Sequence, residues 1–371
     1  MSFNTGKSLC FCILLSLIFT TKINAQDSLA NKGQLTFSGF VDIYYSDNLN
    51  NPASKTFPGF FYNYNNDNHI AVNLALLRAN YTNDRMHMNV GLMTGTYAGA
   101  NLAAEPALFQ NIYEANVGIK LSKKHNLWFD GGVLTSHIGF ESAISKDCWT
   151  LTRSVAAENS PYYHTGAEIT YTSPKEKFVA SLLYLNGWQR MQRPPANSTP
   201  AGGWQIIYKP NDKLTLNSCS FVGNDKPDSI AQIRLFHHFN LLWQPTKKFG
   251  LIFGFDYGME QKPVDSLNKQ SGFNSWYSPV VIARYFITDA FAIAARFENY
   301  SDPKHVIVTH LASEGSGITG VSLNTDFYFS PNALLRFEYK MFMNDKKVFE
   351  QGKNKYSTSN GIFSVSLSGY F

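Results

Sequence analysis

Apolar and polar residues alternate along most of this chain with a period of two, in segments of roughly ten residues. Such alternation places neighbouring side chains on opposite faces of a β-strand. In the clearest segments the ionisable side chains all share one face. These segments are residues 37–45, 113–121, 251–260, 321–329 and 335–341. The pattern predicts an all-β chain whose strands each have one apolar and one polar face.

The connections between these segments come in two alternating lengths. The short ones are residues 82–85, 122–126, 173–176, 210–213, 245–248, 287–290 and 330–333. Their Asn, Asp and Pro residues indicate tight turns. The long, polar ones lie near residues 47–68, 98–110, 139–163, 188–201, 225–232, 261–274, 301–318 and 344–358. Short periplasmic turns and long extracellular loops are typical of a transmembrane antiparallel β-barrel.

The number of connections predicts the size of the barrel. Seven short turns and eight long loops join sixteen strands. Fourteen strands remain an alternative, because four segments alternate poorly: residues 69–81, 177–187, 201–209 and 214–224. An even number of strands places both termini on the periplasmic side. A barrel of about sixteen strands is also wide enough to enclose an aqueous channel.

The phase of the alternation assigns side chains to lipid or to water. Side chains expected to face lipid include Phe253, Phe255, Val321 and Leu323. On the opposite face of the same strands, we expect Asn324 and Asp256 to face water. A soluble sandwich would show the same alternation, but it would not explain the two lengths of connection.

The amino end of the sequence fits export from the cytoplasm. Lys7 precedes a short apolar run over residues 9–19, and Ala25 stands at the expected cleavage point. This is the pattern of a secretory signal peptide. The run is too short to cross ~30 Å of hydrocarbon as a helix. We therefore expect residues 1–25 to be cleaved and residues 26–371 to form a single barrel domain.

The carboxyl end carries a second location signal. Residues 363–371 alternate strictly, and Phe371 falls on their apolar face. The closing strand of an outer-membrane barrel presents apolar side chains to lipid and an aromatic ring at the interface. This ending resembles the assembly signal of bacterial outer-membrane proteins. The resemblance implies that the barrel-assembly machinery recognises the C-terminal strand through Phe371.

Composition narrows the classes of partner. Charged residues make up 16% of the chain and aromatic residues 15%, which suits a surface between lipid and water. The net charge of +5 becomes +3 once Lys7 and Lys22 leave with the signal peptide. So mild a charge argues against a nucleic-acid partner. The mature chain keeps two cysteines, Cys148 and Cys219, which we expect to be unpaired, although one disulfide between them stays open.

The sequence offers only weak candidates for a metal site or a catalytic site. His237 and His238 are adjacent, so on a strand they point to opposite faces and do not easily share a metal. We expect no catalytic residue, no metal and no cofactor, and hence no enzyme. An outer-membrane acyl hydrolase is the less favoured alternative, because it needs a serine and a histidine together on an outward face. Sequence spacing does not assemble that pair.

Three stretches carry a resemblance to a known family. The opening strand over residues 39–45, the Asn-rich loop over residues 48–68 and the Gly-Phe-Glu run over residues 139–141 resemble β-barrel porins of the OmpL-like type found in Bacteroidota. The likeness covers nearly the whole mature chain. It implies an outer-membrane pore of a Gram-negative bacterium that lets small hydrophilic solutes diffuse passively. Its implied partners are outer-membrane lipid and those solutes, and a homo-oligomer stays open.

The inward face of the strands supplies the candidate pore residues. The basic side chains expected there are Arg78, Arg234, Arg284, Arg296, Arg336 and Lys340. The acidic ones are Asp42, Glu114, Asp130, Asp256, Glu298, Asp326 and Glu338. Rings of charged side chains set the selectivity of a pore, and the near balance of signs predicts weak selectivity. The alternative is that neighbours such as Arg296 and Glu298 are solvated wall residues paired across strands.

The longest loop, residues 139–163, is the candidate constriction. A loop of this length is uncommon without a function or disorder. In general porins the corresponding loop folds inward, so the resemblance implies that Glu141, Lys146 and Arg153 reach the wall near Arg296 and Arg336. Two alternatives stay open. The loop would lie outside the barrel in one, and in the other the barrel would be a non-conducting structural or adhesive protein.

Overall fold

The computed structural model describes residues 33–263, 272–309 and 317–371. The predicted signal peptide, residues 1–25, lies outside these described residues, so its cleavage stays a prediction. The barrel corresponds to one compact unit, Gln34–Phe371. Among the described residues, no helix combines the length and the apolar character needed to span a bilayer.

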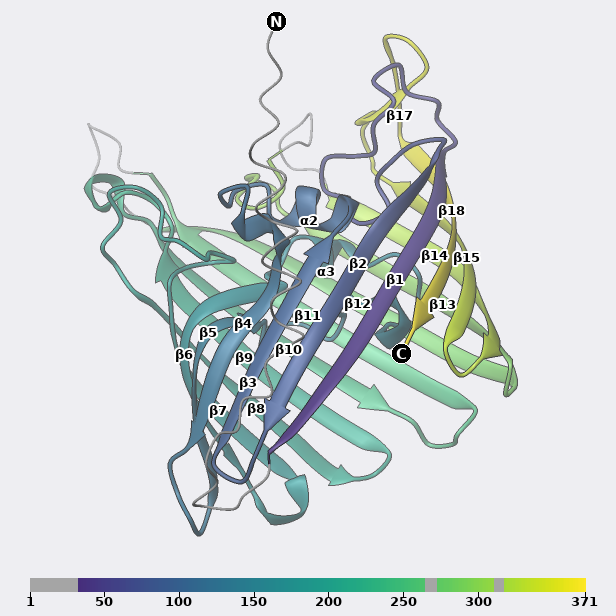
Figure 1. The fold of residues 1–371 in the computed structure, drawn as a ribbon. Helices are drawn as coiled ribbons and strands as arrows, with labels where there is room; N and C mark the ends of the chain where they lie inside the picture. The colour runs from purple at the N-terminus through teal and green to yellow at the C-terminus, as the bar shows by residue number, and fades with distance from the viewer. Residues whose placement is uncertain (1–32, 264–271, 310–316) are drawn as a thin grey trace, which may run out of the picture. The chain divides into compact units, whose positions relative to one another are not determined.

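Sixteen antiparallel strands close into one barrel in the described part of the chain, with β1 (Gln34–Asn48) hydrogen-bonded to β18 (Ser359–Tyr370) (Figure 1). The other strands of the first half are β2 (Ile70–Thr82), β3 (Met86–Thr94), β4 (Ile112–Lys120), β5 (Asn126–Thr135), β6 (Tyr163–Thr172), β7 (Phe178–Leu185) and β8 (Ala201–Asn211). Those of the second half are β9 (Leu214–Asn224), β10 (Ile233–Trp243), β11 (Phe249–Gln261), β12 (Phe273–Thr288), β13 (Phe291–Ser301), β14 (Gly317–Ser330) and β15 (Ala333–Met343). The prediction of sixteen strands is confirmed, and the alternative of fourteen is wrong.

Helices are short and lie in the long loops. They are α2 (Thr96–Asn101), η1 (Phe109–Asn111), η2 (Ser145–Asp147), α3 (Val155–Glu158) and η4 (Asp228–Ile230). One turn contains η3 (Pro174–Glu176), and the last long loop contains the hairpin of β16 (Phe349–Gln351) and β17 (Lys355–Ser357). We call the long loops that matter below L1 (residues 49–69), L2 (95–111), L3 (136–162), L4 (186–200) and L7 (302–316).

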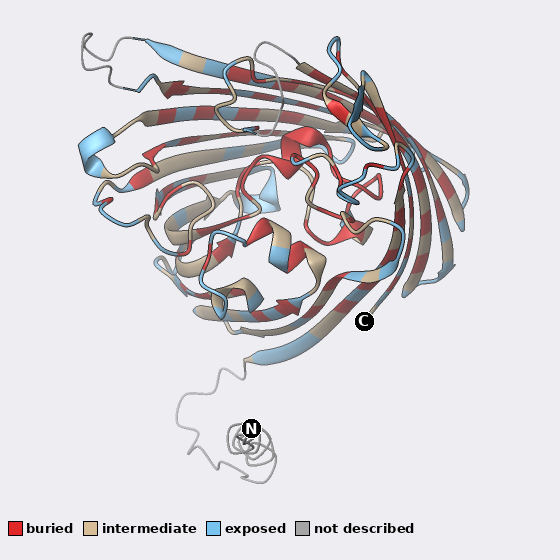
Figure 2. Cartoon of the chain, turned by 90° about the horizontal axis from the view of Figure 1, so that it is seen from above, coloured by how far each residue is buried: buried red, intermediate tan, exposed pale blue. Residues whose placement is uncertain are grey.

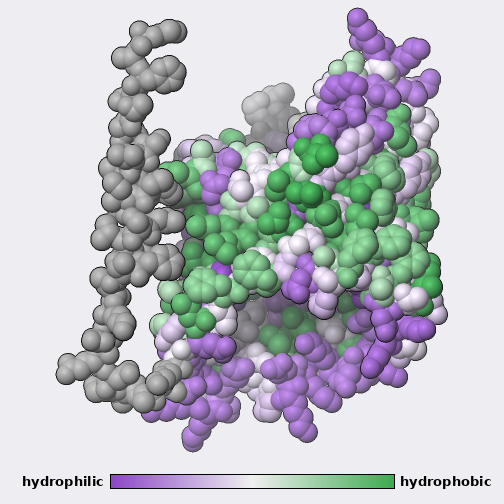
Figure 3. All heavy atoms as spheres, turned by 45° about the vertical axis from the view of Figure 1, so that its right-hand side comes forward, coloured by the Kyte–Doolittle hydropathy of each residue, from purple (hydrophilic) through white to green (hydrophobic). Residues whose placement is uncertain are grey.

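The outward face of the strands is apolar, as the alternation predicts. Leu323 is 58% exposed and Phe253 38%, and Figure 3 shows a belt of apolar residues across the strands with polar residues above and below it. On the inward face the prediction for two residues is wrong. Asn324 and Asp256 are 0% and 4% exposed, because segments inside the barrel cover them.

The core of the molecule lies inside the barrel. Figure 2 looks down the barrel and shows buried segments within the ring of strands. One apolar cluster joins Phe60 and Phe61 of L1 to wall residues such as Phe342. A second joins Leu102 of L2 and Ile144 of L3 to the wall around Leu76. L1, L2 and L3 therefore fill part of the lumen with side chains of their own.

The seam between first and last strand closes at a glycine. Gly39 and Phe371 exchange two backbone hydrogen bonds of 3.1 and 3.2 Å, and the Phe371 ring lies where a Cβ on Gly39 would be. Phe371 is 74% exposed on the outside, and the register pairs Phe40 with Tyr370. Because Gly39 has no side chain, the Phe371 ring packs directly against its backbone.

The two faces of the wall should respond differently to a new charge. Leu323→Arg should lower the free energy of unfolding by ~2–4 kcal/mol, because a guanidinium near the middle of the lipid-facing belt loses its hydration. Asn80→Arg, at a half-buried lumen position on β2, should cost much less. Denaturant unfolding in lipid vesicles measures both. Equal losses would mean that the strand phase is wrong.

Candidate functional site

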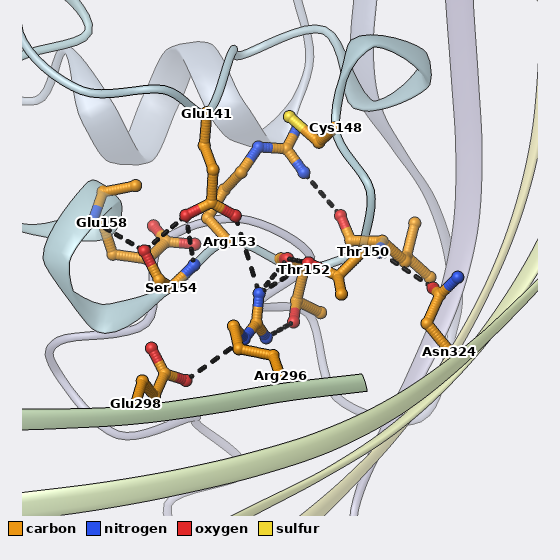
Figure 4. Close-up of polar contacts among 12 residues, drawn as sticks. Glu141, Cys148, Thr150, Thr152, Arg153, Ser154, Glu158, Arg296, Glu298 and Asn324 are labelled. Carbon is orange, nitrogen blue, oxygen red and sulfur yellow. Dashed lines mark hydrogen bonds and ion pairs between the residues drawn. The ribbon is translucent and has the colours of Figure 1, made fainter. Parts of the chain in front are cut away.

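L3 lies against the inner wall formed by β13, β14 and β15, and charged wall side chains hold its backbone (Figure 4). Arg296 on β13 is the centre of this contact. Its Nη1 donates to Thr150 Oγ1 at 2.8 Å and to the Thr152 carbonyl at 2.7 Å, and its Nη2 donates to Thr152 Oγ1 at 2.9 Å. The same guanidinium pairs with Glu338 at 2.9 Å and lies 3.6 Å from Glu141. Arg296 therefore ties L3 to two strands at once.

The acidic wall side chains accept hydrogen bonds from the loop backbone. Glu298 accepts from the Val155 amide at 2.6 Å, and Glu338 accepts from the Thr152 amide at 2.5 Å. Asn324, which is neutral, accepts from the preceding amide of the loop, that of Leu151, at 2.9 Å. A buried amide without a partner would cost free energy comparable to a lost hydrogen bond. These three wall residues remove that cost.

The basic wall side chains bind the loop carbonyls in the same way. Arg336 donates to the carbonyls of Ser145 at 2.6 Å and Cys148 at 3.1 Å, and its other contacts are with Asp326 at 2.7 and 3.0 Å. Lys340 donates to the carbonyl of Arg153 at 2.8 Å and pairs with Glu298 at 2.9 Å. Each buried charge therefore has both an opposite charge and a backbone partner, the condition under which a buried ion pair is tolerated.

Two charged residues of L3 fold the loop onto itself. Arg153 donates to the carbonyls of Ser142 and Leu151 at 2.5 Å and of Ala143 at 3.1 Å. Glu141 accepts from the Ser154 amide at 3.0 Å and from the Ser154 hydroxyl. Ser154 in turn caps α3 by accepting from the Ala157 amide at 3.1 Å. Arg153 is fully buried, so it shapes the loop and does not reach the wall arginines.

L1 is fastened to L3 through one carboxylate. Glu158 accepts from the amides of Tyr62 and Asn63 at 3.1–3.3 Å and from the Asn63 side chain at 3.1 Å. Burial raises the pKa of Glu158 from 4.5 to about 7, although Asn63, Arg153 and Lys340 favour its charged form. The contact between the two loops therefore contains a group that titrates near neutral pH.

A second group of hydrogen bonds, centred on one carboxylate, joins L1 and L3 to the pair of strands β1 and β18 that closes the barrel. Asp42 on β1 accepts from Tyr64 of L1 at 2.6 Å, from Ser145 of L3 at 2.8 Å and from Ser366 on β18 at 2.6 Å. Sequence reasoning placed Asp42 on the inward face but missed Tyr64 and Ser145. Nothing in the sequence signals that these two side chains meet, because they lie on loops without periodicity.

The remaining candidate residues stand apart from this buried contact. Lys146 and Asp147, at the tip of L3, pair at 2.7 Å with side chains 31% and 46% exposed. On the wall, Arg78 is 31% exposed and pairs with Glu114 at 2.6 Å. Arg284 on β12 lies 4.5 Å from the ring of Trp149 in L3. Lys146, Asp147, Arg78 and Arg284, unlike the wall residues under L3, remain at least partly accessible to solvent, whereas Glu114 is buried.

The candidate set thus divides into two groups. Five predicted pore-lining residues are at most 2% exposed and are occupied by contacts with L3 or within it: Arg153, Arg296, Glu298, Arg336 and Glu338. For these five the structure contradicts the expectation of a solvated wall or of a lining exposed to solutes. The physical reason is that their hydrogen bonds go to loop backbone, which excludes water from them.

The wall of β2, β3 and β4 is lined differently. Asn80 donates to Asn89 at 2.6 Å, Asn89 donates to Asn116 at 2.7 Å, and Asn116 donates to the Val133 carbonyl at 3.0 Å. The first two are half-buried on the lumen side. This amide ladder consists of neutral side chains that each both donate and accept, so it forms a polar wall without net charge.

The outer wall contains a polar pair that sequence spacing did not reveal. The register of β9 and β10 brings Ser218 Oγ within 3.2 Å of His237 Nε2 on the lipid-facing side. The structure therefore brings together an outward serine and histidine that sequence spacing alone does not assemble. Asp256 binds His238 at 2.5 Å inside the barrel. It lies across the wall from His237 and cannot orient that ring as a catalytic acid would.

Metal and disulfide chemistry find no support in the part of the chain that the structure describes. No group of three or more potential His, Cys, Asp or Glu ligands is close enough there to hold a metal ion. Cys148 in L3 and Cys219 on β9 are both buried and free. The prediction of two unpaired cysteines, one in a loop and one in a strand, is confirmed.

Comparison with known families decides the class of protein. The model of the family described as Putative beta-barrel porin-2, OmpL-like, matches residues 34–371. The chain belongs to this family. It is an outer-membrane channel protein of the Gram-negative porin type, as the sequence resemblance implied, and the family places it among porins rather than among enzymes. Its origin in Bacteroidota stays a prediction.

Solved structures with the same fold include an outer-membrane channel, a porin and a further outer-membrane protein. The outer membrane channel DcaP of Acinetobacter baumannii is 11% identical, with 93% of this chain and 99% of that chain covered and a TM-score of 0.61. An anion-selective porin from Comamonas acidovorans is 11% identical, with 92% and 100% covered and a TM-score of 0.60. OmpT of Vibrio cholerae is 12% identical, with 93% and 99% covered and a TM-score of 0.57. At these identities the likeness concerns the fold alone. No curated protein matches the chain.

Removing one partner of the buried contact should release L3. Glu338→Leu leaves the Thr152 amide unpaired and Arg296 without its closest carboxylate, which should cost roughly 3–5 kcal/mol of loop docking. Limited trypsin digestion of the folded porin should then cut after Lys146 or Arg153 faster than in the wild type. Ser322→Ala is the control, since the Ser322 hydroxyl is buried without a hydrogen-bond partner beside Arg296. Equal cutting in both variants would contradict the anchoring role.

The contact between L1 and L3 should weaken as pH rises. The pKa of Glu158 is raised in the docked state, so its protonated form favours docking, and that contribution is lost as pH rises through about 7. Hydrogen exchange at the Tyr62 and Asn63 amides, corrected for the intrinsic pH dependence, should accelerate between about pH 4.5 and 7, the interval between the ordinary and the raised pKa of Glu158. Glu158→Gln should remove this dependence. An unchanged pH profile in that variant would assign the effect to another group.

Proposed function

We propose that this porin lets small hydrophilic solutes diffuse passively past L3, which narrows the lumen. The observation that carries the proposal is the attachment of L3 to the inner wall through Arg296, Glu338 and Arg336. A loop held by that many buried contacts occupies the same part of the lumen permanently. The open cross-section is therefore the part of the lumen that L1, L2 and L3 leave unfilled.

The selectivity of this passage would come from few charges. We assign it to the accessible pair of Lys146 with Asp147, to Arg78, whose partner Glu114 is buried, and to Arg284. Each pair is neutral, which supports weak ion selectivity. Arg296, Glu298, Arg336, Glu338 and Arg153 belong to the anchorage of L3, so they would influence permeation only through the position of the loop.

Lipid contact and assembly fit the outer surface. The apolar belt supports outer-membrane lipid as the surrounding medium. The packing of the Phe371 ring against Gly39 supports a role for the C-terminal strand when the barrel-assembly machinery closes the barrel. A related solved structure is a trimer form of OmpT, and a homo-oligomer is compatible with the family.

An acyl hydrolase is the second candidate, favoured by one observation. Ser218 and His237 form a hydrogen-bonded pair on the outer wall. A hydrolytic triad also needs a third group that orients the histidine, and the nearest carboxylate partner on these strands, Asp256, faces the lumen. Release of fatty acid from a phospholipid by the purified barrel would favour this candidate over a channel without chemistry.

Shortening L3 tests the channel proposal. Replacement of residues 145–158 by a short Gly-Ser linker should raise single-channel conductance in a planar bilayer, because the segment occupies the lumen. The matched control replaces Lys353 and Asn354, exposed at the turn of the hairpin of β16 and β17 in another loop, by Gly-Ser and should leave conductance unchanged. Unchanged conductance after the L3 replacement would contradict the constriction. Absence of conductance in the wild type would favour the structural or adhesive alternative.

A further inference from the structure

A second polar site lies at the long-loop end of the lumen, away from the contact between L3 and β13–β15. A cavity of about 360 Å³ is lined there by residues of L1, L2, L3, L4, L7 and the first part of β10. Its lining includes Tyr62, Trp188, Arg190, Arg234 and Ile307. Five loops that are distant in the sequence therefore contribute to one cavity above the passage.

Hydrogen bonds between the loops hold the shape of this cavity. Gln189 of L4 donates to the Asn101 carbonyl of L2 at 3.0 Å and accepts from the Tyr162 amide of L3 at 2.8 Å. L1 is held to L3 through Glu158. A site whose walls are fixed before the ligand arrives loses less free energy to ordering when it binds.

The two arginines of the lining differ in their partners. Arg234 pairs with Glu260 at 2.6 Å and lies 3.6 Å from Asp225. The Glu158 carboxylate accepts hydrogen bonds from the backbone of L1. Arg190, in contrast, forms no ion pair with any described residue, and its Nε is buried without a hydrogen-bond partner. The Arg190 guanidinium thus has an unused N–H donor in the lining.

One part of the lining is suited to a carbon skeleton. Trp188 packs edge-on against Phe221 and Phe236 at ring distances of 5.0 and 4.9 Å, which fixes its orientation. Ala104 of L2 and Ile307 of L7 add apolar surface, and the remainder of the lining is largely polar, with residues such as Ser160. A ligand that matches this lining has a short carbon skeleton, an anionic group and surface that tolerates polar neighbours.

We propose that this cavity is a binding site for a small organic anion, whose carboxylate pairs with Arg190 while its carbon skeleton lies beside Trp188. A guanidinium offers two parallel N–H donors to a carboxylate, which gives a charge-assisted and directional contact. The inference rests on the proposed function, because it gives the channel a class of solute that is held before it passes L3. Neutral solutes of the same size lack the group that Arg190 binds.

Calorimetric titration of the detergent-solubilised porin tests the site without relying on conductance. Benzoate is the probe, and benzamide, which has nearly the same shape but no charge, is its control. We expect saturable binding of benzoate and none of benzamide. Arg190→Gln should weaken benzoate binding about tenfold or more, the value of a hydrogen bond to a charged group. Arg193→Gln is the matched control, because Arg193 is on the same loop and binds Ser198 and Tyr184 instead.

Several results would overturn the site. Equal binding of benzamide would show that charge does not matter, and equal losses in both arginine variants would show that net charge alone is responsible. No benzoate binding by a porin that migrates as a folded, heat-modifiable band would exclude the site outright. In planar bilayers benzoate should also interrupt the current of the wild type more than that of Arg190→Gln. A barrel that binds benzoate but carries no current would overturn the channel proposal and leave the site standing.

Discussion

The lumen of this porin depends on the pairing of buried wall charges with the backbone of L3. Arg296, Lys340 and Arg336 point inward from β13 and β15, where isolated charges would lose the hydration that makes them tolerable. The loop supplies carbonyls for the cations, and its amides turn toward Glu298 and Glu338. Both partners need the other, since the two short helices of L3 satisfy only part of its backbone, and the ion pairs within the wall leave N–H groups of Arg296, Arg336 and Lys340 for the loop carbonyls.

The barrel could be predicted from the sequence because the residue patterns that specify its strands and turns are local. The alternation at residues 321–329 specifies a strand and its phase, and the short turns specify which end is which. The failure at Asn324 and Asp256 has a different origin. Alternation assigns a side chain to the inward face, but it does not tell whether water or another part of the chain occupies the space in front of it.

The site was only partly readable, because its contacts are set by geometry between distant segments. The inward direction of Arg296 and Glu338 follows from strand phase, whereas their preference for Thr152 over water depends on where L3 lies. The pair of Ser218 and His237 depends on the register between β9 and β10, which a one-residue slip would destroy. Arg190 stands out because its Nε is buried without a hydrogen-bond partner, which depends on the positions of the surrounding loops and not on its sequence context.

The amide ladder on β2, β3 and β4 differs in its chemistry from the wall that binds L3. Asn80, Asn89 and Asn116 carry no group that gains or loses a proton, so these positions present the same hydrogen-bonding pattern in acid and in alkali. The wall of β13, β14 and β15 is built from ions whose neutrality depends on matched partners. Acidification of the surrounding medium would therefore change the charge balance under L3 and leave the hydrogen bonds of the three asparagines unchanged.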